Sequence, residues 1–228
     1  MGFGVPAMRR GFRATLAIGL AGLVSACGTN SDQARYATLA WRLVTGRTNE
    51  VSRDQAGAVP FASLGVSIGR NDEGLMVLGL DEGARQEWYA RTQMLAMNNG
   101  RIVQSQGFPY NLSRLEVRAR DGSTIPVGGA PPVDTDYSLV ADYMDLSLIG
   151  AGASCRSTET GEESIEILGT SLTTRHVVED CRIAVIDWSF ENEFWVDPDT
   201  GFVWQSRQYV HPKLPRVTFR VLRPPQQS

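Results

Sequence analysis

Apolar and polar residues alternate along much of the chain after residue 60, with the period of two that is typical of strands buried on one face. Residues 217–221 predict one such strand near the C-terminus. Residues 184–191 predict another, with Asp187, Ser189 and Glu191 on its solvent face. Its buried face is expected to carry Ala184, Ile186, Trp188 and Phe190.

Turn residues separate the apolar runs. The run 61–68 is followed by the turn-rich residues 69–74 and by a second run, 75–80, which together predict a hairpin. Segment 88–97 fits either a strand or a short helix. Asn99-Gly100 follows it, and Asn-Gly between apolar runs is a strong hairpin signal.

Four other segments complete the pattern. Residues 32–44 predict one short N-terminal helix, and the polar residues 45–57 predict a loop. The stretch 121–135 is rich in Pro and Gly and predicts a second loop, while residues 197–201 predict a tight turn.

Strands at this spacing, joined by short turns, predict a mainly β protein. We expect an antiparallel meander curved into a half-barrel or open barrel, with the single short helix before it. The expected organisation is a signal peptide over 1–26, a lipidated tether over 27–35 and one β-rich domain over 36–228.

Composition excludes several classes of protein. With 42% hydrophobic and 21% charged residues, the chain can bury a core, which excludes disorder as its main state. Beyond the N-terminus no segment approaches the roughly 18–20 apolar residues of a membrane span. The net charge of −3 argues against nucleic acid as a partner.

The N-terminus has the pattern of a secretory signal. Three arginines precede the uncharged stretch 14–26, which is too short to span a membrane. The stretch ends in Val24-Ser25-Ala26-Cys27, which resembles the lipobox of bacterial lipoproteins. In such signals the cysteine thiol is the nucleophile that receives the lipid, so we expect Cys27 to be lipidated and the chain to be cleaved before it. The alternative is a buried structural cysteine after an apolar helix.

The same region bears on export and sorting. Arg9-Arg10 hints at twin-arginine export, but the usual polar residue before the pair is missing, so Sec export is favoured. Either Met1 or Met8 fits as the start. Gly28 after the cysteine favours, by resemblance to Gram-negative sorting, an acyl anchor in outer-membrane lipid, with the protein facing the periplasm.

Cys155 and Cys181 are the other two cysteines. An oxidising compartment permits a disulfide, and their count is even once Cys27 carries lipid. Two buried free thiols are the alternative.

A coherent catalytic site is not evident in the sequence. The two histidines, His176 and His211, lack a second ligand at metal-binding spacing, so we expect no metal and no cofactor, and structural or solvent-facing roles for both. Neither a nucleophile elbow nor a phosphate-binding loop is present. The acidic residues 159–163 predict a solvated hairpin tip. Further carboxylates between 179 and 193 leave a glycosidase as a weak alternative to a non-enzyme.

Aromatic and arginine side chains are the remaining candidates for ligand binding. Aromatic rings stack on sugars, and guanidinium groups pair with anionic groups, although codon bias explains the arginine content equally well. For each tryptophan the alternative is core packing. The candidate ligand-binding residues are Trp88, Trp195, Trp204 and Arg207.

Segment 192–201, with 205–208 and Phe219 after it, resembles the YjbF/GfcB (YmcC) family of capsule and exopolysaccharide lipoproteins. Pro60-Phe61-Ala62, Trp88 and segment 99–103 match in the same order, so that the resemblance covers roughly residues 36–222. Residues 122–135 and the cysteine pair do not map onto the family. The resemblance implies an outer-membrane lipoprotein with a curved antiparallel sheet, encoded with polysaccharide export machinery. It supplies no catalytic residues.

These observations favour a periplasm-facing accessory to exopolysaccharide or capsule production or secretion, which binds glycan or a protein of the export machinery. One alternative is a carrier of lipid or acylated ligand, with a cavity lined by residues such as Ile186, Trp188 and Phe190. A third hypothesis is a polysaccharide-trimming glycosidase, which needs two carboxylates facing one cleft.

Overall fold

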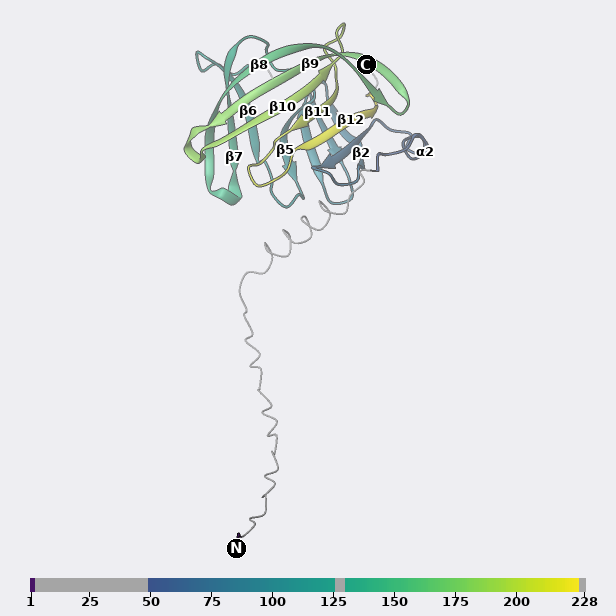
Figure 1. Ribbon diagram of the computed structural model, residues 1–228. Coiled ribbons are helices and arrows are strands. Elements are labelled where there is room, and N and C mark those ends of the chain that lie inside the picture. Colours follow the sequence, from purple (N-terminus) through teal and green to yellow (C-terminus); the bar gives the residue numbers. More distant parts are fainter. Residues whose placement is uncertain (3–48, 126–129, 226–228) are drawn as a thin grey trace.

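The computed structural model describes residues 1–2, 49–125 and 130–225 of the chain. Within these residues, twelve antiparallel strands form one sheet in the order β5-β4-β3-β2-β1-β12-β11-β10-β9-β8-β7-β6. The sheet curves back on itself (Figure 1). Its edge strands, β5 (Arg101–Gln106) and β6 (Arg114–Ala119), meet at a seam, where the Ser105 N–H donates to the Leu112 carbonyl at 2.9 Å. The predicted antiparallel meander, curved into an open barrel, is confirmed.

The first strands form the predicted hairpins, with one difference. β1 (Ser63–Ile68) and β2 (Gly74–Glu82) pair across the turn at 69–73. Segment 88–97 lies in two strands, β3 (Arg85–Tyr89) and β4 (Met94–Asn98), because the Ala90 N–H donates to the Gln93 carbonyl and reverses the chain. Asn99 and Gly100 then turn the chain into β5 with φ values of 44° and 88°.

The long strands of the second half are β7 (Asp136–Tyr143), β8 (Leu148–Ile167), β9 (Thr170–Ile183) and β10 (Trp188–Val196). The single strand predicted over 184–191 is wrong over its first half. Residues 184–186 form the 3-10 turn η2 (Ala184–Ile186), and Asp187 then adopts a φ of 48°. A positive φ breaks a strand, so Ile186 is 37% exposed in the turn instead of buried.

The acidic residues 159–163 also lie elsewhere than predicted. They are in the middle of β8, where their backbone pairs with β9, and the hairpin tip is at Leu168-Gly169. Two successive residues with positive φ, Leu168 and Gly169, form the tip. Leucine rarely adopts a positive φ, so the sequence gives no sign of a turn at Leu168.

The last two strands close the sheet. β11 (Val203–Gln208) pairs with β10 across the predicted turn at 197–201, and β12 (Val217–Arg223) pairs with both β11 and β1. The first and last strands are therefore hydrogen-bonded neighbours. In Figure 1, β8 and β9 run across the top of the barrel above β10, β11 and β12.

One short helix, α2 (Arg53–Gly57), precedes the barrel in the stretch that the sequence predicts as a loop. Ser52 and Gln55 form a capping box, which stabilises even this single turn. The predicted helix 32–44, the cleavage site and Cys27 lie outside the described residues. No helix in the described ranges has the length and hydropathy needed to cross a membrane.

Two apolar clusters hold the fold together. The inner core fills the barrel with inward-facing side chains, among them Trp88, Phe194 and Phe219. The outer cluster lies under the end of the β8–β9 hairpin, where side chains of the hairpin pack on the outer face of β10 to β12. Its members are Ile165, Ile167, Leu168, Leu172, Trp195, Trp204 and Leu222.

Candidate functional site

A groove of about 590 Å³ lies on the outer face of β8, β9 and β10, near η2. Strand alternation places its polar side chains outward, while the intervening residues Cys181 and Phe190 belong to the inner core. The groove is lined by Ser154, Asp180, Cys181, Arg182, Ser189, Phe190, Glu191, Tyr209 and Arg216.

One wall of the groove exists because β11 pairs with only part of β10. The pairing runs from Glu193 to Val196, so residues 188–192 have no neighbouring strand on that side. The chain after β11 crosses there instead, and the Tyr209 N–H donates to Asn192 Oδ1 at 2.8 Å. The Tyr209 ring meets the rings of Trp188 and Phe190, at centroid distances of 6.0 and 6.2 Å. This wall thus presents an aromatic ring beside the polar floor.

The guanidinium groups of the groove are engaged by protein carboxylates. Arg216 Nη1 lies 2.6 Å from Glu193 Oε1, and its guanidinium carbon is 5.9 Å from the Tyr209 ring centroid. Arg182 Nη2 lies 2.5 Å from Asp187 Oδ1, and its Nη1 donates to Ser189. Both positive groups of the lining therefore have an anionic partner.

The two carboxylates of the lining, unlike its guanidinium groups, have no close partner of opposite charge among the described residues. Asp180 and Glu191 are exposed and stand directly opposite each other on β9 and β10. The side chain of Asp180 has no hydrogen bond or ion pair within the described part of the chain, and the Glu191 carboxylate is 3.9 Å from Arg216. Like charges facing each other across two strands are destabilising, so this pair does not serve the fold.

Behind the groove, the inner face of the same strands carries a buried ion pair. Arg101 of β5 donates to Glu179 of β9 at 2.6 and 3.1 Å, with side-chain exposures of 2% and 0%. Asn192 and Tyr137 also donate to this carboxylate. Burial alone would raise the pKa of Glu179, but Arg101 and these hydrogen bonds hold that pKa below its ordinary value.

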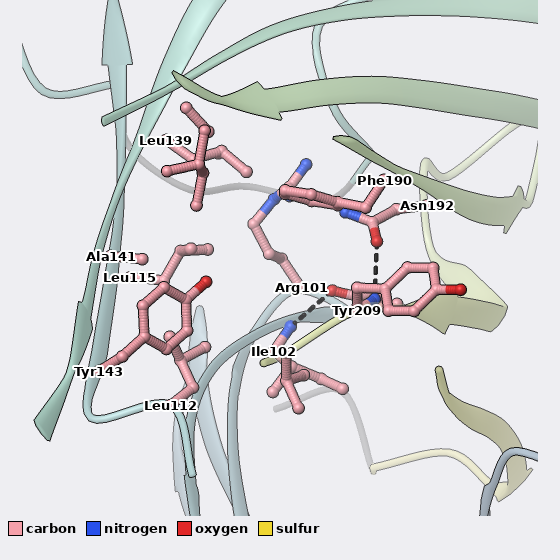
Figure 2. A pocket seen from close by; sticks show the side chains of 14 residues that line it. Arg101, Ile102, Leu112, Leu115, Leu139, Ala141, Tyr143, Phe190, Asn192 and Tyr209 are labelled. Atoms are coloured by element: carbon pink, nitrogen blue, oxygen red, sulfur yellow. Dashed lines mark hydrogen bonds between the residues drawn. The ribbon is translucent and has the colours of Figure 1, made fainter. Parts of the chain in front are cut away.

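The barrel interior next to this ion pair is almost filled. Figure 2 shows Leu115 and Tyr143 on one side of a small pocket, Phe190 and Tyr209 on the other, and Arg101 between them. The pocket holds about 10 Å³, which is roughly the space of a single water molecule. An acyl chain does not fit there.

The buried polar groups also tie β5 to β11 near the seam. Gln208 of β11 accepts from the Ile102 N–H at 3.1 Å and donates to the Gly100 carbonyl at 2.8 Å. These contacts, with the Arg101–Glu179 pair, connect the edge strand to two other strands through the interior.

The predicted disulfide between Cys155 and Cys181 is present, buried between paired positions of β8 and β9. Its sulfur atoms lie close to the Glu179 carboxylate, with ligand atoms within 4.8 Å of one another. Thiolates bind metals, whereas both sulfurs here are joined to each other and Glu179 is paired with Arg101. This group is therefore unsuited to hold a metal ion.

Three of the four predicted ligand-binding residues come together, although away from the groove. Trp195 lies between the His176 ring, 4.8 Å away, and the Arg207 guanidinium, 4.9 Å away. Only 2% of Trp195 is exposed, so no face of its ring is free for stacking. Trp204 packs in the same outer cluster and donates to Asp197. Trp88 is also 2% exposed and packs apart from them, in the inner core.

Most of the residues that line the groove are not identifiable as binding residues from the sequence. In the sequence, Asp180 and Glu191 are only two of several carboxylates between residues 179 and 193. Their opposition follows from the turn at 184–187, which the alternating pattern concealed. Tyr209 and Arg216 carry no sequence signal, because their role depends on where the pairing of β11 ends.

His211 lies in the interior near the seam and is fully buried. Its ring stacks on Tyr110 at 5.1 Å. Its Nδ1 accepts from the Lys213 N–H, and its Nε2 faces Asp145 Oδ1, each at 3.0 Å. Burial lowers the pKa of His211, although Asp145 acts in the opposite direction.

Comparisons with known proteins agree with this architecture. The family model described as group 4 capsule polysaccharide lipoprotein GfcB, YjbF, matches residues 36–222. The uncharacterized lipoprotein GfcB of Escherichia coli (strain K12) is 24% identical over 200 residues, which cover 86% of this chain and 92% of that protein. The crystal structure of the hypothetical lipoprotein YmcC from Escherichia coli (K12) superposes with a TM-score of 0.63 at 22% identity, covering 88% of this chain and 99% of that one. The family match spans most of the chain, and the chain belongs to the YjbF family of group 4 capsule polysaccharide lipoproteins.

Proposed function

We propose that this protein is an outer-membrane lipoprotein, facing the periplasm, that assists the production or secretion of capsule or exopolysaccharide by binding the glycan in the groove on β8 to β10. The observation that carries the proposal is the pair of exposed carboxylates beside the ring of Tyr209: Asp180, whose side chain has no partner among the described residues, and Glu191, which has only the contact of 3.9 Å with Arg216. Carboxylate oxygens accept hydrogen bonds from sugar hydroxyls, and an aromatic ring packs against the apolar face of a sugar.

Glycan is favoured over a protein of the export machinery as the occupant of this groove. Protein interfaces centre on buried apolar and aromatic anchors surrounded by a polar rim. The groove has the reverse character, since its floor carries Ser154, Asp180, Arg182, Ser189 and Glu191.

Binding without cleavage is favoured over the glycosidase hypothesis. Asp180 and Glu191 do face one groove, as a glycosidase requires. A glycosidase also needs an apolar environment around one carboxyl group, which keeps the acid protonated, and both side chains here are exposed. The small interior pocket likewise gives no support to a lipid carrier.

The proposal includes the anchor at Cys27, preceded by the signal pattern of residues 1–26. Cys27→Ser removes the thiol that receives the lipid and leaves the hydrophobicity of the signal unchanged. This variant should lose label from radioactive palmitate and leave the outer-membrane fraction. A labelled Ser variant that stays in that fraction would contradict the anchor.

The glycan-binding role is tested with polysaccharide purified from the strain that carries the gene, by calorimetry or affinity electrophoresis. Asp180→Asn and Tyr209→Ala should each weaken binding by about tenfold or more, because each removes a direct contact. Glu82→Gln is the matched control, since Glu82 is an exposed carboxylate at the end of β2, outside the groove. Equal binding by the wild type and both groove variants, or no binding by the wild type, would contradict the proposal.

A further inference from the structure

The positive and negative groups of the groove differ in how available they are to a ligand. Two of the carboxylates, Asp187 and Glu193, hold Arg182 and Arg216, and Glu193 also lies 3.4 Å from Arg207. The other two, Asp180 and Glu191, stand opposite each other. The two guanidiniums of the lining, those of Arg182 and Arg216, are thus held at 2.5 and 2.6 Å by carboxylates outside the lining, whereas, among the described residues, the two carboxylates of the lining have only the contact of 3.9 Å between Glu191 and Arg216. The hydrogen-bonding capacity that is left to a ligand is mainly that of an acceptor.

Arg156 is the cation best placed to compensate the charge of Asp180, because it stands opposite Asp180 on β8. Its guanidinium is instead paired with Asp136 at 3.2 Å, and it does not line the groove. The carboxylate of Asp180 is therefore left without a compensating charge among the described residues.

An acidic sugar placed on this floor would meet two carboxylates at short range. Like charges at hydrogen-bonding distance repel each other, and the repulsion is stronger at the lower effective dielectric of a protein surface than in bulk water. The arginines would offer the ligand only the donors that Asp187 and Glu193 leave unused. A neutral sugar avoids the repulsion, because its adjacent hydroxyls donate directly to Asp180 and Glu191.

We propose that the groove selects uncharged, hydroxyl-rich sugar units and rejects uronate-bearing or sulfated ones. This inference rests on the proposed glycan-binding function and names the class of sugar that the site takes. Asp180 and Glu191 are the selecting residues, and Tyr209 contributes to affinity without discriminating charge.

The test uses the full-length protein on an array of neutral, uronate-containing and sulfated oligosaccharides, with the native polysaccharide as reference. The bound members should be uncharged, and their affinity should change less than about twofold between low and physiological salt, because no ion pair forms with the ligand. Preferential capture of uronate-containing or sulfated members would overturn the selectivity while leaving glycan binding intact. Capture of no oligosaccharide, together with no binding of the native polymer, would instead contradict the glycan-binding function itself.

A charge reversal sharpens the test. Glu191→Lys should weaken binding of the neutral members by about tenfold and create measurable, salt-sensitive binding of polygalacturonate. Glu82→Lys makes the same substitution on an exposed residue outside the groove and is the matched control. Polygalacturonate binding that rises equally in both variants would show that overall charge, and not the groove, governs selection, and would overturn the inference.

Discussion

Glu179 and Asp180 are neighbours in β9, yet they lie on opposite faces of the sheet with opposite surroundings. Glu179 is fully buried and is bound by Arg101, Tyr137 and Asn192. Asp180 is exposed and has no partner among the described residues. The strand next to it repeats the contrast, because Asn192 faces the interior and Glu191 faces the groove.

This difference separates what maintains the fold from what remains available to a ligand. A buried polar group that loses its partner costs far more than an exposed one, so the interior network uses all of its hydrogen-bonding capacity on itself. The outer pair costs the fold little and leaves its acceptors open. Substitutions on the two faces of β9 and β10 should therefore act on different properties.

Arg101→Met removes the cation of the buried ion pair and should have the largest effect on stability. It leaves the Glu179 carboxylate buried without its cation, which should lower the free energy of unfolding by about 3–5 kcal/mol. Urea unfolding monitored by tryptophan fluorescence measures the change.

The double variant Arg101→Met/Glu179→Gln is the control for that experiment. It removes the uncompensated charge and keeps an acceptor for Tyr137 and Asn192, so it should recover part of the lost stability. If the double variant were no more stable than the single one, the loss would come from packing and not from an unpaired charge.

The fully buried His211 should make the free energy of unfolding depend on pH. Because burial depresses its pKa in the folded protein, the unfolded chain binds the proton more readily. Its contribution to stability is complete above the unfolded pKa of about 6.5 and is lost as the pH falls toward the lower folded pKa. The free energy of unfolding should therefore decline between about pH 7 and pH 5, before the window of Glu179 is reached.

His211→Gln should flatten that decline, whatever its effect on stability at neutral pH. Urea unfolding at a series of pH values gives the slope directly. An unchanged slope in the variant would show that another group carries the pH dependence.

Glu191→Gln tests the outer side and should have the smallest effect on stability. It removes the repulsion with Asp180 and sacrifices only the contact of 3.9 Å with Arg216. We expect the free energy of unfolding to rise by about 0.2–1 kcal/mol while glycan binding weakens. In a thermal melt, Asp136→Asn should show no such gain, because Asp136 is paired with Arg156. Destabilisation by Glu191→Gln would mean that the outer carboxylates also serve the fold.

Features set by local chemistry were predictable from the sequence. Asn99-Gly100 gives a hairpin because both residues tolerate positive φ, and the strand over 217–221 follows from simple alternation. The turn at 184–187 was not predictable in the same way, because the alternation continues through it and only the φ of Asp187 reverses the chain.

The site depends on contacts that are distant in the sequence. Arg101 and Glu179 are 78 residues apart, and no short pattern connects them. The predicted aromatic residues were the large and conspicuous ones, but Trp88 and Trp195 bury too much apolar area to stay exposed. The ring that borders the groove is Tyr209, whose place is fixed by the tertiary course of the chain after β11.

The pairing of β1 with β12 sets the order in which the molecule can be completed. Val66 lies opposite Phe219, so the strand that is synthesised first waits for the strand that is synthesised last. Contacts between such distant segments form slowly, and until they form, β1 and β11 each expose an edge to which another chain can add. The barrel therefore closes only once β12 is available to pair with β1. A chain cut short before β12 would be left with two open edges, prone to aggregation.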